Sequence, residues 1–172
     1  MLSPKKDDEK IANEFLSLAQ SVGLTLQTAY ADVSDKIKTG FTLNSALITA
    51  VIALGTFIQK EFTTVSTIYW FLIPMAISLL VFCVALAIGV WVYLRGHLQY
   101  VDPMDIVMTY IDGGKPYTFF LNKWASTICE ANNENAAAVK SKHTGLQLMY
   151  SLIIAGLVIL AISFLVVAII VK

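Results

Sequence analysis

Four side chains near the middle of the chain could bind a metal ion, because imidazole and carboxylate groups are common zinc ligands. His97 is close in sequence to Asp102 and Asp105, and the second histidine of the chain is His143. The alternative is that these are ordinary polar side chains at a membrane surface. No phosphate-binding glycine loop, HExxH pattern or paired-cysteine motif accompanies them. We therefore expect no metal, no cofactor and no catalytic residue, with a membrane enzyme built around His97 as the remaining alternative.

A second group with chemical potential lies in the stretch from Trp124 to Leu152, which begins amphipathic, collects Asn, Lys and His, and ends wholly apolar. Asn132 and Asn135 stand three residues apart, which puts both amides on one face of a helix. An Asn on such a face commonly sets the register or the oligomeric state of packed helices. A contact to a nucleotide or an ion is the alternative.

The elements that position these residues are membrane helices. The chain has 172 residues, of which 57% are hydrophobic, more than is usual for a soluble domain. Residues 41–59, 68–94 and 146–172 form three apolar segments, and a bilayer is crossed by about 20 residues. Apart from the terminal Lys172 they carry no Asp, Glu, Lys or Arg, which argues against a proton relay or an ion-coupled transporter. The formal net charge of zero gives no indication of nucleic-acid binding.

The basic residues predict the orientation, because cytoplasmic segments are enriched in Lys and Arg. Most of them lie before the first span or between the second and third: Lys5, Lys6, Lys10, Lys36, Lys38, Arg95, Lys115, Lys123, Lys140 and Lys142. We expect residues 1–40 and 95–145 in the cytoplasm of a multi-pass protein of the plasma membrane. The short loop 60–67 and the C-terminus are expected outside.

Residues 1–40 are expected to form an amphipathic helix. Its apolar residues recur with eleven-residue spacings: Ile11, Phe15, Leu18, Val22, Leu26, Ala29, Val33 and Ile37. An eleven-residue repeat corresponds to about 3.67 residues per turn, so the stripe stays on one face of a nearly straight helix. Such a stripe needs a packing partner along its whole length, in the same protomer or in another. The alternative is that the helix lies flat on the membrane, which its modest Lys content and many acidic residues favour less.

Residues 95–145 are expected to form a helical insert. A short helix should run from Asp102 to about Ile111, and the sequence "DGGKP" at 112–116 should break it. A longer helix should begin near Tyr117 and run into the third span, with Gly145 as the single soft point. Its stripe follows the same repeat: Tyr117, Leu121, Trp124, Ile128, Asn132, Asn135, Val139 and His143.

The stretch "YADVSDKIKTGFTLNSALITAVIALG" resembles the three-span membrane domain of Pycsar-type and SLATT-type antiphage effectors. In that pattern an Asp-Lys pair ends a cytoplasmic helix, and an Asn follows early in the first span; Asp35, Lys36 and Asn44 match. A Lys shortly before the last span matches at Lys140 or Lys142. The order of span, short outer loop, span, helical insert and span also matches.

The resemblance implies a membrane effector that oligomerises and breaches the bilayer on a signal. The family commonly adds a separate cyclic-nucleotide-binding domain, for which the 40 residues before the first span are too few, so no nucleotide contact is carried over. We expect an all-α integral membrane protein that is not an enzyme, a homo-oligomer whose cytoplasmic bundle controls permeability in response to an unidentified small molecule or protein. The alternative is an accessory subunit of a larger membrane enzyme or transporter complex. The residues expected to couple the bundle to the spans are Asp35, Lys36, Asn44, Trp124, Asn132, Asn135 and Lys142.

Overall fold

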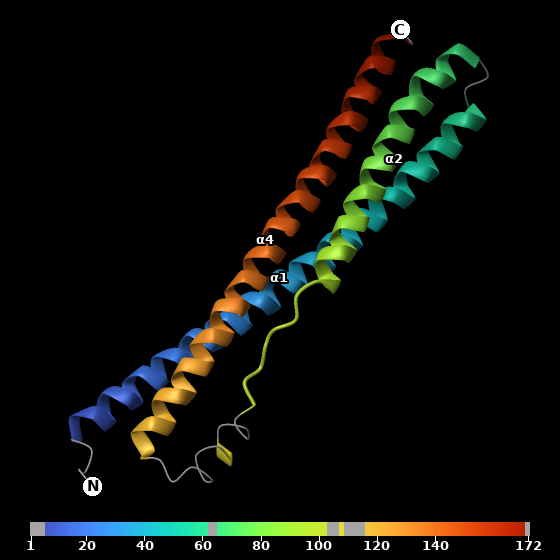
Figure 1. Cartoon of the computed structure of the whole chain (residues 1–172). Helices are drawn as coiled ribbons and strands as arrows, with labels where there is room; N and C mark the ends of the chain where they lie inside the picture. Colours follow the sequence, from blue (N-terminus) through green and yellow to red (C-terminus); the bar gives the residue numbers. More distant parts are fainter. Residues whose placement is uncertain (1–5, 62–64, 103–106, 109–115, 171–172) are drawn as a thin grey trace. The chain divides into compact units, whose positions relative to one another are not determined.

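The chain is described by a computed structural model that covers residues 6–61, 65–102, 107–108 and 116–170. Three long helices make up nearly all of it: α1 (Lys6–Glu61), α2 (Val65–Leu94) and α4 (Tyr117–Ile170) (Figure 1). The all-helical prediction is confirmed. An extended segment, 96–102, follows α2. The short helix and the break expected between Asp102 and Pro116 lie mostly outside the described residues.

All three helices are long and apolar enough to span a membrane. The apolar windows of α2 and α4 have mean hydropathies of 2.8 and 2.6, against 1.8 in α1. α1 and α4 contain 56 and 54 residues, more than twice what one crossing needs. α4 passes through Gly145 without interruption, as the sequence predicted.

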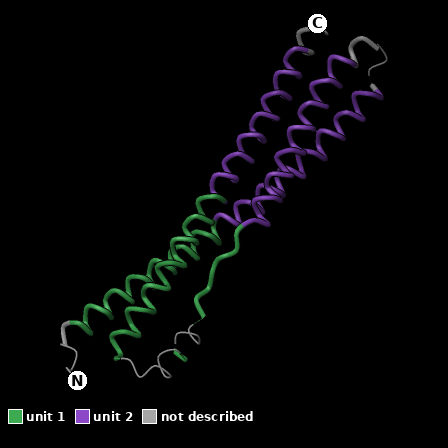
Figure 2. The backbone as a smooth tube through the Cα atoms, viewed as in Figure 1, with its two compact units in different colours: residues 1–32, 96–141 green, residues 33–95, 142–172 purple. Residues whose placement is uncertain are grey.

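The chain divides into two compact units, each built from segments far apart in sequence (Figure 2). Unit 1 comprises residues 1–32 and 96–141, so the first part of α1 packs with the first part of α4 and with the extended segment. Unit 2 comprises residues 33–95 and 142–172, and contains the rest of α1, all of α2 and the rest of α4.

Within unit 2, α2 runs antiparallel to α1. The ring of Phe41 meets that of Tyr93 near the end of α2, with centroids 6.1 Å apart. Gly55 faces Met75 near the beginning of α2. Residue numbers thus fall along α2 as they rise along α1.

The same reversal relates α2 to α4 in unit 2. Phe71 meets Phe164 edge to face with ring centroids 6.0 Å apart, while Val92 lies against Gly145. The last part of α1 and the last part of α4 therefore run in the same direction. The core between the three helices is apolar and includes Ile37, Phe82 and Met149.

The buried positions follow a regular alternation of four and three residues, which we call the seam of each helix. In α2 the seam is Phe71, Met75, Ser78, Phe82, Ala85, Gly89 and Val92. In the unit 2 part of α4 it is Lys142, Leu146, Met149, Ile153, Gly156, Leu160 and Ser163. This spacing is 3.5 residues per turn, as in coiled coils. The buried positions of α1 follow it too, at Ala12, Ala19, Val33 and Ile37, so the period of 3.67 expected there is wrong for the buried face. Helices that wrap around each other keep contact only at the shorter period.

The difference changes which residues are buried in unit 1. The α1 seam there uses small residues, with Ala12 and Ala19 almost fully buried. The first half of the expected stripe lies one position away and is exposed, as at Ile11 and Leu18. In α4 the expected stripe and the seam share Leu121, Asn132 and Asn135, which are all buried. Ala125 and Lys142 are also buried and take the places expected for Trp124 and His143, and His143 is exposed.

Candidate functional site

The clearest polar contact of unit 1 is made by Asn135 on α4. Its side-chain oxygen accepts a hydrogen bond from the backbone N–H of Gln99 at 2.7 Å, and its side-chain nitrogen donates to the backbone carbonyl of Gln99 at 3.1 Å. Asn135 is 6% exposed. One amide side chain therefore pairs with both backbone groups of one residue, which fixes the extended segment 96–102 against α4.

Two further hydrogen bonds complete this arrangement. Asn132 donates from its side-chain nitrogen to the carbonyl of Ala19 on α1 at 2.8 Å. The hydroxyl of Tyr30 on α1 donates to the carbonyl of Gly96 at 2.6 Å. Because a buried polar group that loses its partner costs about 1–3 kcal/mol, these bonds define one arrangement of α1, α4 and the extended segment.

A hollow of about 360 Å³ lies beside these bonds within unit 1. It is lined by residues of α1, the extended segment and α4: Gln20, Gly23, Leu24, Gln27, Gln99, Tyr100, Val101, Ile128, Ala131, Asn132 and Asn135. None of these side chains is charged. Amides donate and accept hydrogen bonds but do not transfer protons at physiological pH, so the chemistry available here is binding and positioning.

Unit 2 has a polar contact of its own at Asn44, which is fully buried on the α1 seam. Its side-chain nitrogen donates to the carbonyl of Phe82 on α2 at 2.7 Å. Within the described part of the chain, the Asn44 side-chain oxygen and the hydroxyl of the equally buried Ser78 have no hydrogen-bond partner. Unpartnered polar groups are costly in an apolar interior, so they weaken this packing relative to an all-apolar seam.

Lys142 is the one buried cationic side chain among the described residues, and it is 2% exposed. Its ammonium donates to the carbonyl of Tyr93 at 3.2 Å and lies 5.5 Å from the centre of the Tyr93 ring. Tyr93 stands in the last turn of α2, where carbonyls lack partners within the helix and the helix dipole favours a positive charge. Lys142 therefore acts as a C-terminal cap for α2.

Asp35 and Lys36, the pair that carried the resemblance, stand on α1 in unit 2. Asp35 accepts a hydrogen bond from Lys38 at 2.9 Å, because residues three apart share a helix face and neighbours do not. This carboxylate raises the pKa of Lys38 above its usual value. The backbone carbonyl of Lys36 accepts a hydrogen bond from the hydroxyl of Tyr150 at 3.2 Å, which links α1 to α4 within unit 2.

The expected coupling residues thus fall into two sets. Asn132 and Asn135 line the same hollow of unit 1, while Trp124 is half-buried and packs edge to face on Phe120 with ring centroids 5.2 Å apart. Asp35, Lys36, Asn44 and Lys142 belong to unit 2. The structure gives partners within the protomer to the buried amides and to Lys142, and an influence of these residues on assembly stays a prediction.

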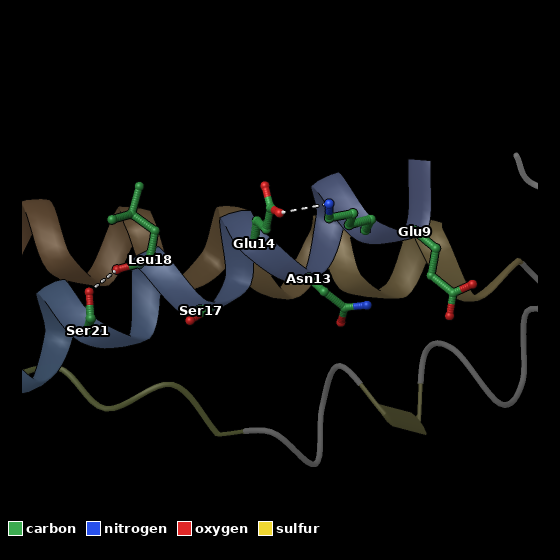
Figure 3. Close-up of a pocket in the computed structure, with 7 residues that line it drawn as sticks. Glu9, Asn13, Glu14, Ser17, Leu18 and Ser21 are labelled. Atoms are coloured by element: carbon green, nitrogen blue, oxygen red, sulfur yellow. Dashed lines mark hydrogen bonds and ion pairs between the residues drawn. The ribbon is translucent and has the colours of Figure 1, made fainter. Parts of the chain in front are cut away.

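The histidine neighbourhood offers no metal site in the described residues, where no three His, Cys, Asp or Glu side chains could hold an ion together. His97 and Asp102 are exposed, and Asp105 lies outside the described residues. Another hollow, of about 730 Å³, lies along the first part of α1, where residues of this helix alone line it, among them Asn13, Ser17 and Leu18 (Figure 3). It is an open helix surface.

Sequence reasoning missed the partners of these groups. The contacts use the backbone of Gln99, the backbone carbonyl of Tyr93 and the hydroxyl of Tyr30. These groups become partners only because particular helices meet, which the sequence does not state. Ser78 could have been found, because it stands at a four-and-three spacing between Met75 and Phe82 in an otherwise apolar seam.

No protein family, no curated protein and no solved structure matches this chain. Its function is therefore inferred from the buried polar contacts and from the three apolar helices.

Proposed function

We propose that the chain is a multi-pass protein of the plasma membrane, with unit 1 on the cytoplasmic side and the C-terminus outside. Support comes from the apolar helices and from the concentration of Lys and Arg before the first span and between the second and third. On this reading the bilayer surrounds most of unit 2. The large exposed apolar side chains of α2, including Ile73, Ile77 and Leu80, then face lipid.

The proposed activity is control of membrane permeability by an oligomer, without enzymatic chemistry. The observation that carries it is the way unit 1 is tied to all three membrane helices. α1 and α4 contribute residues to both units as single helices. α2 leads directly into the extended segment, whose Gly96 and Gln99 are held by Tyr30 and Asn135.

A rearrangement of unit 1 would therefore act on every span at once. A small molecule in the 360 Å³ hollow, or a protein bound to unit 1, would bias this arrangement if it bound one state more tightly than the other. The resemblance to three-span antiphage effectors extends the proposal to a role in defence, with the cytoplasmic bundle as the part that receives the signal.

The test combines assembly and leakage. The protein extracted gently from its native membrane, with its lipids, should form a particle of many copies of this chain alone. Reconstituted into liposomes that hold a self-quenched dye, it should release dye, and Asn132→Leu together with Asn135→Leu should change the rate of release. A multimer that releases no dye in either form would contradict the proposal.

A second candidate is an accessory subunit of a larger membrane complex. The observation in its favour is the row of exposed apolar side chains on α2 at Ile73, Ile77, Leu80 and Val84, whose spacing of four and three residues suits a partner helix as well as lipid. Co-extraction with larger proteins at a constant ratio would favour this candidate over the homo-oligomer.

A further inference from the structure

One exposed face of α2 changes from apolar to aromatic to cationic toward the end of the helix. It consists of Leu80, Val84, Ala87, Trp91 and Arg95, all exposed, which we call the graded face. The spacing of four, three, four and four positions keeps these residues on one side of the helix. The backbone N–H of Arg95 donates to the carbonyl of Trp91 at 3.0 Å, so Arg95 continues the last helical turn.

The dimensions of the graded face match one leaflet of a bilayer. Leu80 and Trp91 are eleven positions apart, a rise of about 16 Å, and half of the hydrocarbon layer measures about 15 Å. Arg95 lies about 6 Å beyond Trp91 along the axis, and each headgroup layer is about 5–7 Å thick. With Trp91 at the edge of the hydrocarbon layer, the apolar residues lie beside acyl chains and Arg95 lies among lipid phosphates.

The side chain of Arg95 is placed to bind a phosphate. Its guanidinium carbon lies over the ring of Trp91, 4.3 Å from the ring centre. A guanidinium that lies over a ring keeps its N–H groups along its own edge, where two of them can bind two oxygens of one phosphate. The ring of Trp91 thus supports the cation at the depth where the phosphates are found.

The charges around Arg95 favour a lipid with a net negative headgroup. Because α2 is antiparallel to both of its neighbours, one end of unit 2 collects four cationic side chains: Lys36, Lys38, Arg95 and Lys142. Asp35 is the one carboxylate at this end, and it is paired with Lys38 at 2.9 Å. The next charges along α1 and α4, Asp32 and Lys140, belong to unit 1 and are opposite in sign. Clusters of Lys and Arg at the cytoplasmic membrane surface attract anionic lipids.

We propose that the graded face binds an anionic phospholipid of the cytoplasmic leaflet, with the phosphate on Arg95 and an acyl chain along Leu80 and Val84. This inference rests on the membrane placement given under Proposed function, and it depends neither on a pore nor on an oligomer. A zwitterionic phospholipid offers the same acyl chains and the same phosphate. The positive charge around Arg95 therefore determines which of the two lipids is preferred.

The first experiment compares the lipids that surround the two ends of α2. Variants that keep only Trp91 or only Trp70 are reconstituted into liposomes of equal parts phosphatidylglycerol and phosphatidylcholine, with bromine on the acyl chains of one lipid at a time. Quenching of Trp91 should be at least about twofold stronger when phosphatidylglycerol carries the bromine. Trp70 is the control, because residues 65–75 carry no charge, and the two lipids should quench it equally.

Two results of this comparison would overturn the lipid site. Equal quenching of Trp91 by the two brominated lipids would show that the graded face does not select an anionic headgroup. An equal preference for phosphatidylglycerol at Trp70 and Trp91 would show a general attraction of the protein to anionic lipid, without a site at Arg95.

The second experiment removes the phosphate-binding group in the variant that keeps only Trp91. Arg95→Gln should lose most of the preference for phosphatidylglycerol, whereas Arg95→Lys keeps the charge and should retain part of it. Lys123→Gln is the matched control, because it removes one exposed positive charge from α4 in unit 1, and it should leave the preference unchanged. An unchanged preference in Arg95→Gln, or an equal loss in Lys123→Gln, would contradict the role of Arg95. Circular dichroism should show the same helicity in all variants.

The outcomes separate this inference from the membrane placement on which it rests. If both lipids quench Trp70 and Trp91 strongly and equally, α2 crosses the bilayer as proposed and the anionic lipid site is wrong. If neither lipid quenches either tryptophan, the membrane placement is wrong and the lipid site with it. A preference for phosphatidylglycerol that is confined to Trp91 and depends on Arg95 supports both.

Discussion

Asn135 binds the backbone of Gln99 through both ends of its side chain, so its replacement should have a local and measurable effect. Asn135→Leu keeps a similar volume but leaves the N–H and the carbonyl of Gln99 without this partner. We expect a loss of about 1–3 kcal/mol in the free energy of unfolding. Amide hydrogen exchange should become faster in residues 96–102 than elsewhere in the chain.

Two further variants make this prediction specific. Asn133→Leu is the control, because Asn133 is exposed on the same turn of α4, and it should leave exchange in the extended segment unchanged. Asn135→Asp keeps an acceptor for the Gln99 N–H but loses the donor to its carbonyl, so its effect should be intermediate. Unchanged exchange in Asn135→Leu would show that other contacts hold the segment in place.

The sequence identified some of these residues but not their partners. Asn132 and Asn135 were recognisable because amides interrupt an apolar helical row. Gln99 was not recognisable, because Asn135 binds its backbone N–H and carbonyl, and these groups are common to nearly all residues. His143 was expected on the buried face and Lys142 occupies it, since the choice between adjacent positions depends on a helix period that only the packed partner determines.

At the scale of elements, the existence and length of the helices followed from composition and periodicity. Apolar runs long enough for a membrane predicted α2 and the later parts of α1 and α4. The finer periodicity was misleading, because the eleven-residue repeat combined two different faces of α1. Its early members, such as Ile11 and Leu18, are exposed, while its later members, Val33 and Ile37, are buried.

Close packing of α2 and α4 gives a prediction at Gly145. A Cβ atom there would overlap both methyl groups of Val92, a β-branched side chain that has little freedom to move aside. Gly145→Ala should therefore lower the free energy of unfolding by about 1–3 kcal/mol, although alanine favours a helix more than glycine does. Thermal unfolding of the purified protein in lipid nanodiscs measures the change.

Gly55 provides the matched control for this substitution. It also lies within a helix of unit 2, but a Cβ there would stand 3.5 Å from the terminal methyl of Met75, an ordinary contact. Gly55→Ala should leave stability unchanged or raise it by up to about 1 kcal/mol. If both variants unfolded at the same temperature, α2 and α4 would pack less closely at Gly145 than the structure indicates.

At the scale of the whole molecule, the aromatic residues of α2 suggest where a membrane would begin and end. Tyr69 and Trp70 are exposed near its start, and Trp91 and Tyr93 are exposed near its end, where Arg95 lies 4.3 Å from the Trp91 ring. Trp and Tyr concentrate at the two surfaces of a bilayer. Trp70 and Trp91 are 21 positions apart, which is a rise of about 32 Å and close to the thickness of the hydrocarbon layer.

These positions predict the depth of each tryptophan in a reconstituted bilayer. Variants that keep one tryptophan, with the other two changed to Phe, are compared in liposomes whose lipids carry bromine high on the acyl chains. Fluorescence of Trp70 and Trp91 should be strongly quenched, because both side chains would lie at the two ends of the hydrocarbon layer. Trp124 belongs to unit 1 and packs on Phe120, so it should respond to an aqueous quencher instead.

The same measurement also tests the placement of the units. Strong lipid quenching of Trp124 would put the early part of α4 into the bilayer and would contradict a unit 1 that lies in water. Quenching of Trp91 without quenching of Trp70 would mean that α2 enters the bilayer but does not cross it. Only quenching of both α2 tryptophans, with Trp124 accessible from water, agrees with a crossing α2 and a cytoplasmic unit 1 free to receive a signal.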